Sequence, residues 1–340
     1  MRAVGYTVPG PITAPEALID LDLPVPAASG RDLLVAVQAV SVNPVDIKVR
    51  TGTTPPGGAA TVLGWDAVGV VTAAGPDCRL FAAGDRVFYA GTIARPGSNA
   101  EYQLVDERIV GHAPKSLDVA EAAALPLTSI TAWELLFHRL AVPLGKAPLD
   151  ATLLIVGGAG GVGSMLIQFA RRLTGLRVIA TASREESRRW CLDLGAHAVI
   201  DHSKPMQPQL EAMGVANVAY VASLTATEQH YEALVDILIP QGKFGVIDDP
   251  MTFDVRKLKR KSISLHWESM FTRSVFGTAD MIAQHDILEE VAALVDAGLI
   301  RTTLQQTLSP INAAVLRQAH AQVESGRTIG KIIVTGFAPR

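Results

Sequence analysis

The hydrophobic positions in the first third of the chain follow a short period that is typical of β-strands. Between residues 34 and 40, the positions of Leu34, Ala36, Gln38 and Val40 alternate with those of Val35, Val37 and Ala39, and short apolar runs recur downstream. Glycine and proline separate these segments, as at 55–58, 75–77 and 96–98. The pattern predicts a compact, turn-rich β domain. Its strands are expected at 34–40, 68–73, 86–89 and 100–105.

Helical spacing begins at Ser116. This residue can cap a helix over 120–125, because Asp118 and Glu121 would lie near the positive end of that helix. A proline ends the segment, and a second helix is predicted over 128–140. We interpret this stretch as the passage from one domain to the next.

From residue 152 onwards, strands and helices alternate. The run 152–156 is apolar at every position after Thr152, as expected for a strand that a parallel sheet buries on both faces. Further strands are predicted at 177–181, 198–201, 218–222, 243–247 and 262–266. Helices are predicted at 162–173, 185–194 and 227–238. This alternation predicts a doubly wound parallel sheet.

The last segments are predicted as helices at 287–297 and 312–324 and a strand at 331–334, and we assign them back to the first domain. A chain of 340 residues has the length of about two domains. We therefore predict an α/β protein. A β-rich domain is expected from residues 1–125 and 273–340, and a domain with the doubly wound sheet from residues 126–272.

Composition and charge exclude several classes of protein. There are 30 Lys and Arg against 33 Asp and Glu, and the longest basic cluster is 256–261, so no nucleic-acid partner is expected. No apolar run has the length of a signal peptide or a membrane span, which predicts a cytoplasmic protein without a membrane partner. Cys78 and Cys191 are the only cysteines, so neither a disulfide framework nor a cysteine-rich zinc site is expected.

The strongest motif is Gly158-x-Gly160-x-x-Gly163, which follows the buried strand and opens a helix. In a dinucleotide site the first glycine makes the turn, the second lets the backbone approach the pyrophosphate, and the third lets helix and strand pack closely. The helix N-terminus supplies amide donors, here including Gly161 and Val162. Glycines can also serve only to make a turn, but the strand-turn-helix context favours a dinucleotide.

The end of the second strand of this sheet indicates which dinucleotide binds. An acidic residue there would bond the ribose 2′-hydroxyl of NAD, but the chain has Ser183 and Arg184, which suit a 2′-phosphate and favour NADPH. His202, after the third strand, can face the same phosphate. The alternative is that Ser183 caps the next helix in a capping box with Glu186 and that Arg184 is solvated. Both interpretations can hold together.

Several further segments resemble one known family. They are SVNPVD at 41–46, GWDAVG at 64–69, PGSNAE at 96–101, LTSITA at 127–132 and SLHWE at 264–268. Together with the glycine-rich turn, they resemble the quinone oxidoreductase-like branch of the medium-chain dehydrogenase/reductase superfamily, whose bacterial members are often named zinc-type alcohol dehydrogenase-like proteins. The resemblance implies a GroES-like catalytic domain, a Rossmann cofactor domain with a cleft between them, and a homodimer paired through the cofactor domains.

Zinc ligands of the zinc-dependent relatives are missing from this sequence. Those relatives carry a cysteine in the loop that corresponds to 40–46, a Gly-His-Glu in place of 64–66, and a lobe of four close cysteines. Asn43 is a poor zinc ligand, Trp65 cannot be one, and Asp66 alone leaves the metal with too few bonds. We predict that the protein binds no metal, despite the family name.

Hydride transfer without a metal restricts the acceptor. A quinone or an α,β-unsaturated carbonyl needs mainly proximity, a dry site and one or two hydrogen-bond donors at its oxygen. By resemblance, the loop from Asn43 to Lys48 lines the catalytic cleft. Asn43 would donate to the substrate or to a ribose hydroxyl, Lys48 would stabilise the product anion, and Asp46 would orient Lys48. Alternatively, Asn43 and Asp46 fix a turn by bonding backbone, and Lys48 is solvated.

Other candidates come from matching positions and from strand ends. The cofactor candidates are Thr131, Ser223, Ile247 and Lys331. The candidates for the substrate cleft are Trp65, Tyr89, Trp267 and Phe271. Ordinary packing or capping is the alternative for each of them. The expected function is zinc-independent reduction of a quinone or an enone by NADPH. The alternatives are an NADPH-binding redox sensor with little turnover and, disfavoured by the missing ligands, an alcohol dehydrogenase.

Overall fold

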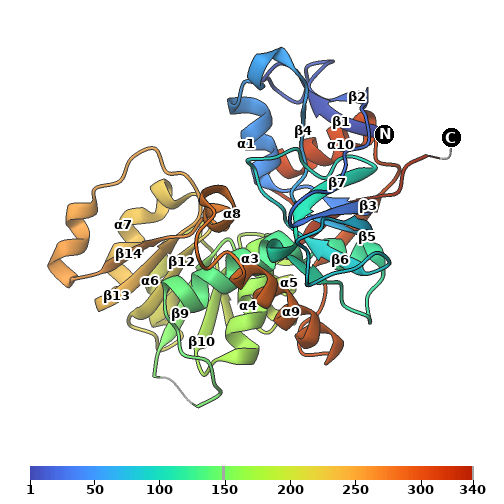
Figure 1. Ribbon diagram of the computed structural model, residues 1–340. Helices are drawn as coiled ribbons and strands as arrows, with labels where there is room; N and C mark the ends of the chain where they lie inside the picture. The colour runs from blue at the N-terminus through green and yellow to red at the C-terminus, as the bar shows by residue number, and fades with distance from the viewer. Residues whose placement is uncertain (148–149, 339–340) are drawn as a thin grey trace. The chain divides into compact units, whose positions relative to one another are not determined.

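The computed structural model describes residues 1–147 and 150–338, and the chain divides into two compact units (Figure 1). Unit 1 is Met1–Ile130 with Phe271–Arg340, and unit 2 is Thr131–Met270. The sequence-based boundaries, after residues 125 and 272, lie within five residues of this division.

Unit 1 is a β-rich body. Among its described residues, seven strands form the larger sheet, with the order β15-β16-β3-β5-β6-β8 and β7 paired with β3. A smaller sheet has the order β2-β1-β4. The strands of the larger sheet are β3 (Asp32–Ser41), β5 (Ala67–Ala74), β6 (Arg86–Tyr89), β7 (Tyr102–Asp106), β8 (Val110–His112), β15 (Leu304–Leu308) and β16 (Lys331–Thr335). Those of the smaller sheet are β1 (Arg2–Tyr6), β2 (Ile19–Asp22) and β4 (Thr61–Val62).

Strand β16 connects the C-terminal part of the chain to the first part of unit 1. It pairs antiparallel with β3, where Ile333 lies opposite Ser41 and Val334 opposite Val40. Its apolar side chains are buried, which is why the run 331–334 reads as a strand in the sequence. This pairing brings the start of β16 close to the loop that follows β3.

The helices of unit 1 correct two sequence-based expectations. They are α1 (Pro44–Gly52), α2 (Val119–Ala123), most of α3 (Pro126–Trp133), α8 (Thr272–Phe276), α9 (Ala283–Asp296) and α10 (Ala313–Glu324). The segment 44–52 is helical, whereas the sequence suggested a turn. The N-cap of α2 is Asp118, which accepts from the Glu121 amide, and not Ser116, whose hydroxyl instead donates to Asp296 at 2.7 Å.

Unit 2 contains the predicted doubly wound sheet, and the fold class is therefore confirmed. Six parallel strands have the order β11-β10-β9-β12-β13-β14 among its described residues. They are β9 (Thr152–Val156), β10 (Arg177–Thr181), β11 (Ala198–Ile200), β12 (Val218–Ser223), β13 (Leu238–Val246) and β14 (Ser264–Trp267). The helices are α4 (Gly161–Leu173), α5 (Glu185–Asp193), α6 (Met206–Glu211) and α7 (Thr227–Ile237). Helix α4 packs on β9 and β10, and α7 packs on β12 and β13.

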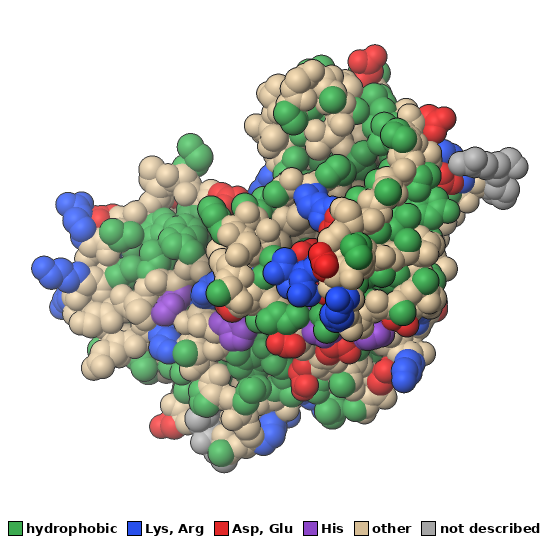
Figure 2. Space-filling view, in the orientation of Figure 1, with side chains coloured by type: hydrophobic (Ala, Val, Ile, Leu, Met, Phe, Trp, Pro, Cys, Tyr) green, Lys and Arg blue, Asp and Glu red, His purple; other side chains and the backbone are tan. Residues whose placement is uncertain are grey.

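Short helical turns complete the two units. They are the 3-10 turns η1 (Pro56–Gly58), η2 (Glu107–Ile109) and η4 (Val255–Lys261), and the π-helix η3 (Glu134–Arg139), which continues α3. No helix of the described chain is long and apolar enough to cross a membrane. On the face in view in Figure 2, acidic and basic side chains are interspersed, and Lys and Arg do not gather into one broad patch.

Candidate functional site

The glycine-rich turn lies between β9 and α4 of unit 2. Gly157 has a φ of 82°, in the left-handed region that favours glycine, so the sharp turn is made there and not at Gly158. A Cβ on Gly163 would lie 2.5 Å from the Gly157 carbonyl oxygen and 2.7 Å from the Gly158 Cα. A Cβ on Gly160 would meet only the Gly157 oxygen, at 3.7 Å. Gly163 is therefore required for packing, whereas Gly160 leaves open space above the turn.

The predicted cofactor residues of unit 2 gather at one edge of its sheet. Because the strands are parallel, the segments after β9, β10, β11, β12 and β13 all leave from the carboxyl edge (Figure 1). Main-chain bonds link neighbouring segments, since the Gly158 amide donates to the Thr181 carbonyl at 3.1 Å and the Ile247 amide to the Ser223 carbonyl at 3.3 Å. Strands β10 and β12 lie on opposite sides of β9, which is the arrangement at a topological switch point.

The segment after β10 holds Ser183 and Arg184. Ser183 is exposed and Arg184 half-buried. Helix α5 begins at Glu185 with Arg184 as its N-cap and no side-chain cap bond. The alternative in which Ser183 forms a capping box with Glu186 is therefore wrong, and the Ser183 hydroxyl does not cap α5.

The segments after β12 and β13 are tied together by a polar network. The hydroxyls of Ser223 and Thr227 lie 2.7 Å apart, and the Thr227 amide donates to Asp248 at 2.9 Å. The Thr227 hydroxyl also donates to Asp248. Ser223 is fully buried in this network, so its hydroxyl positions the start of α7. Ile247 is half-buried beside it.

Unit 1 contains a buried polar cluster of Asn43, Asp46, Asp66 and Lys331, each at most 4% exposed. The Asn43 side-chain amide donates to Asp66 at 2.8 Å, and the Asn43 main-chain amide donates to Asp46 at 2.7 Å. The Lys331 ammonium donates to the Asn43 side-chain oxygen and lies 3.3 Å from Asp66. The main-chain amide of Leu127 donates to Asp66 at 2.7 Å. The side chain of Asn43 is thus engaged through both its oxygen and its nitrogen.

Burial dominates the ionisation of this cluster. It raises the pKa of Asp46 to about 7, although the Asn43 amide and the Lys331 charge act in the opposite direction. Burial also raises the pKa of Asp66, opposed by Lys331 and by the Leu127 amide. The pKa of Lys331 is lowered by burial, and the two carboxylates oppose that shift. Near neutral pH the cluster therefore contains a carboxyl group, Asp46, that exchanges a proton.

The remaining candidates of unit 1 have different surroundings. Lys48 is exposed on α1. Tyr89 is fully buried, and its hydroxyl has no hydrogen-bond partner among the described residues. Trp65 is 1% exposed and donates from its indole nitrogen to the Thr92 carbonyl at 3.0 Å. The ring of Phe271 packs edge-on against Trp65, with the ring centres 6.3 Å apart. Trp65 and Phe271 thus form one aromatic contact inside unit 1.

Thr131 and Trp267 are further candidates that belong to unit 2. Thr131, at its first residue, is buried. Trp267 is 51% exposed at the end of β14 and packs against Phe253, with ring centres 5.9 Å apart. Of the aromatic cleft candidates, Trp267 thus belongs to unit 2, whereas Trp65, Tyr89 and Phe271 belong to unit 1.

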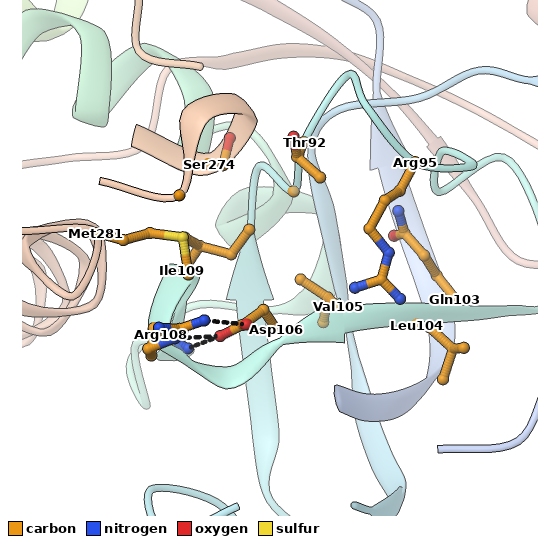
Figure 3. A pocket seen from close by; sticks show the side chains of 12 residues that line it. Thr92, Arg95, Gln103, Leu104, Val105, Asp106, Arg108, Ile109, Ser274 and Met281 are labelled. Carbon is orange, nitrogen blue, oxygen red and sulfur yellow. Dashed lines mark hydrogen bonds and ion pairs between the residues drawn. The ribbon is translucent and has the colours of Figure 1, made fainter. Parts of the chain in front are cut away.

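A pocket of about 190 Å³ in unit 1 contains none of the sequence-predicted site residues (Figure 3). Its charged lining is already paired, since Arg108 forms an ion pair with Asp106 at 2.8 Å and Arg95 forms one with Asp32 at 2.7 Å. We therefore do not assign the cofactor or the acceptor to this pocket.

Comparisons with known proteins decide the family. Residues 29–115 match the model of the alcohol dehydrogenase GroES-like domain, and residues 194–334 match that of the zinc-binding dehydrogenases. The chain is 37% identical to a zinc-type alcohol dehydrogenase-like protein of Staphylococcus epidermidis, over 98% of this chain and 99% of that protein. The chain belongs to the medium-chain dehydrogenase/reductase superfamily. The resemblance drawn from its motifs is confirmed.

Solved structures of this superfamily have the same fold over the whole chain. A crystal structure from Rhizobium etli CFN 42, provisionally named a zinc-dependent alcohol dehydrogenase, is 56% identical with a TM-score of 0.96, and covers 100% of this chain and 99% of its own. The Escherichia coli quinone oxidoreductase complexed with NADPH has a TM-score of 0.83 at 23% identity, over 98% of this chain and all of its own. This medium-chain dehydrogenase/reductase is an oxidoreductase whose Rossmann unit is of the kind that binds a nicotinamide cofactor.

The residues at the zinc positions of this oxidoreductase do not fit a zinc ion. The ammonium of Lys331 lies against Asp66 and Asn43, where it would repel a cation. Among residues 1–147 and 150–338 no group of three or more His, Cys, Asp or Glu side chains could hold a metal. The absence of zinc from the protein itself stays a prediction.

Two residues of the cofactor edge were missed by sequence reasoning. Thr181 bonds the Gly157 amide through its hydroxyl at 3.1 Å, and His230 on α7 lies near His202. Thr181 ends a predicted strand next to the glycine-rich turn, so the sequence could have pointed to it. Nothing in the sequence points to His230, because its proximity to His202 depends on how α7 packs in three dimensions.

Proposed function

We propose that this protein is a zinc-independent, NADPH-dependent oxidoreductase that transfers a hydride to a quinone or an α,β-unsaturated carbonyl compound. The observation that carries the proposal is the combination of a dinucleotide-type glycine turn with a zinc position that is occupied by a lysine ammonium. Bound NADPH would supply the hydride. Because no Lewis acid is available in this account, the acceptor must already be electron-poor.

The choice of NADPH is supported by the segment after β10. Ser183 is exposed, and Arg184 can form charge-assisted bonds to a phosphate on the adenosine ribose. No carboxylate lies in this segment to bond a ribose 2′-hydroxyl. The Escherichia coli quinone oxidoreductase that shares the fold was solved with NADPH, which agrees with this choice.

For the acceptor side we propose two roles in unit 1. Lys48, exposed on α1, would stabilise the negative charge that develops on the acceptor oxygen. Asn43 and Asp46 would position the start of α1, because both are buried and bonded to each other. Thr131 and Lys331 are proposed near the cofactor, and Tyr89, Trp65, Phe271 and Trp267 near the acceptor.

One observation favours a second function. The side-chain amide of Asn43 is engaged at both its nitrogen and its oxygen, so it has little capacity left for a substrate. An NADPH-binding redox sensor with little turnover would need no such donor.

Variants of the segment after β10 test the proposed cofactor. Arg184→Ala is expected to weaken NADPH binding by roughly tenfold to a hundredfold, the strength of one or two charge-assisted hydrogen bonds, and to leave NADH binding nearly unchanged. Arg189→Ala on the exposed face of α5 is the matched control, since the ion pair of Arg189 with Glu185 is on the surface. Equal losses for NADPH and NADH in Arg184→Ala would contradict the assignment.

A further inference from the structure

A chain of hydrogen bonds joins the glycine-rich turn to a histidine. The Gly157 amide donates to the Thr181 hydroxyl oxygen at 3.1 Å, and that oxygen lies 2.9 Å from Nδ1 of His202. Thr181 is buried, so water does not compete at its hydroxyl. Nε2 of His202 has no hydrogen-bond partner among the described residues.

This chain leaves two positions for the proton of a neutral His202. The Thr181 oxygen accepts from Gly157 through one lone pair, so its hydroxyl can donate to a bare Nδ1, or its second lone pair can accept from a protonated Nδ1. In the imidazolium form both ring nitrogens carry a proton, Nδ1 donates to the Thr181 oxygen, and Nε2 is a donor.

A second histidine lies beside the first. The ring centres of His202 and His230 are 5.7 Å apart, and His230, on α7, is only 8% exposed. Two positive charges at this separation would repel each other, so the pair accepts a first proton more readily than a second. A phosphate group close to the pair would favour the protonated form.

The charged groups around the pair are few. Asp201, adjacent to His202, forms an ion pair with Lys204 at 3.3 Å, so their charges largely cancel. Strand β10 contributes only the neutral Thr181, and α7 contributes His230. Burial lowers the pKa of both histidines, and Asp201 partly opposes this for His202. Without a ligand the pair is therefore mostly neutral at pH 7.

We propose that the His202–His230 pair makes the choice of cofactor proton-dependent. With a proton bound, the pair attracts a phosphate monoester on the adenosine ribose. Without that proton, the pair is neutral, and the preference for the phosphate over a hydroxyl decreases. The inference rests on the proposed use of NADPH and extends it to regulation of the same site by pH.

Affinities for NADPH and NADH, measured by calorimetry at pH 6, 7 and 8, test the proposal. In the unaltered protein the preference for NADPH is expected to fall by on the order of tenfold from pH 6 to pH 8. In His202→Gln the preference should stay level or rise, because the second ionisation of a phosphate monoester, near pH 6, only adds negative charge as pH increases. His230→Gln should partly reduce the fall in the preference for NADPH between pH 6 and pH 8. Ser183→Ala is the control, expected to weaken NADPH binding without changing the slope.

Calorimetry in buffers with different ionisation enthalpies adds a second readout. Binding of NADPH at pH 7 should take up a fraction of a proton in the unaltered protein and less in His202→Gln. A preference for NADPH with the same pH slope in His202→Gln and His230→Gln as in the unaltered protein would overturn this proposal alone. Equal affinities for NADPH and NADH at every pH would overturn the proposed cofactor and this proposal together.

Discussion

At the scale of single residues, the least expected feature is the buried cluster around Lys331. The sequence pointed to Asn43 and Asp46 together in one loop and to Lys331 separately, and the pairing of β16 with β3 brings Lys331 to them. Two carboxyl groups share one ammonium there, so the net charge depends on protonation. Ionising buried groups of this kind costs free energy, and removing one partner leaves the other charge buried and uncompensated.

Asp46 should make the protein less stable as pH rises through neutrality. Its folded-state pKa of about 7 lies above the ordinary value of 3.8, so the folded state retains a proton that the unfolded state releases. The contribution of Asp46 to stability is then greatest below about pH 4 and falls until about pH 7. Asp46→Asn should remove this fall and gain on the order of 3 kcal/mol relative to the unaltered protein between pH 5 and 8.

Urea unfolding at several pH values measures this effect. Asp77→Asn is the control, because Asp77 is exposed and its side chain has no hydrogen bond among the described residues. If the difference in unfolding free energy between Asp46→Asn and the unaltered protein does not vary with pH, Asp46 is already ionised at pH 5.

Lys331 should be essential for stability because it compensates the buried charge of Asp66. Lys331→Met leaves Asp66 buried without its cation and is expected to cost roughly 3–5 kcal/mol of unfolding free energy. The double variant Asp66→Asn with Lys331→Met removes both charges and should recover a large part of that loss. Thermal and urea unfolding give both values. If the double variant is no more stable than Lys331→Met, the charge pairing is not what Lys331 contributes.

At the scale of elements, the glycine-rich turn has one glycine that packing requires, Gly163, and one that we expect cofactor binding to require, Gly160. Gly163→Ala places a methyl group 2.5 Å from the Gly157 carbonyl oxygen, so it should destabilise unit 2 by a few kcal/mol. Gly160→Ala meets only one atom, at 3.7 Å, and should leave stability within about 1 kcal/mol. It should nevertheless weaken NADPH binding at least about tenfold, because the backbone could no longer approach the pyrophosphate.

Melting temperature and cofactor affinity, measured on both variants, distinguish the two glycine roles. Tight NADPH binding by a stable Gly160→Ala would place the pyrophosphate away from this turn. Unaltered stability of Gly163→Ala would mean that α4 can shift to accept the methyl group.

Elements with strong local signals were predicted closely from the sequence. Strands β6, β9 and β10 have the predicted bounds, because each is a short apolar run that begins and ends at polar residues or glycine. Helix α1 was missed because its first residue, a proline, also suits a turn, and α6 because a proline interrupts it. Strand β13 is longer than predicted, since its first half contains proline and glycine.

The candidate site was predictable only where it is local in sequence. The glycine-rich turn and the segment after β10 follow from strand-turn-helix patterns. The contacts of Lys331 with Asn43, and of His202 with His230, join residues far apart in sequence. Such contacts depend on sheet order and helix packing, which hydrophobic periodicity does not specify.

At the scale of the whole molecule, β14 is an exposed edge of the six-stranded sheet. Among the described residues it pairs only with β13, and Trp267 at its end is 51% exposed. Figure 2 shows hydrophobic side chains gathered over the part of unit 2 where Figure 1 labels β14 and α7. An unpaired edge with exposed apolar side chains favours pairing with a second copy of the chain. We therefore expect a homodimer through unit 2.

Light scattering after size-exclusion chromatography tests this expectation. The unaltered protein should have twice the 36.0 kDa mass of the chain. Trp267→Glu should shift it toward the monomer, whereas Phe276→Glu, at an equally apolar and 78% exposed site in unit 1, should not. A dimer that resists Trp267→Glu would place the interface elsewhere.

The central claim is hydride transfer from NADPH without a metal. The most direct test is the initial rate of NADPH oxidation, and separately of NADH oxidation, by protein treated with a chelator and verified by elemental analysis, against a panel of quinones and 2-alkenals. We expect no stoichiometric zinc before treatment and rapid turnover after it, with NADPH preferred. Stoichiometric zinc, together with loss of turnover when it is removed, would contradict the account, and tight NADPH binding without turnover would favour the redox sensor.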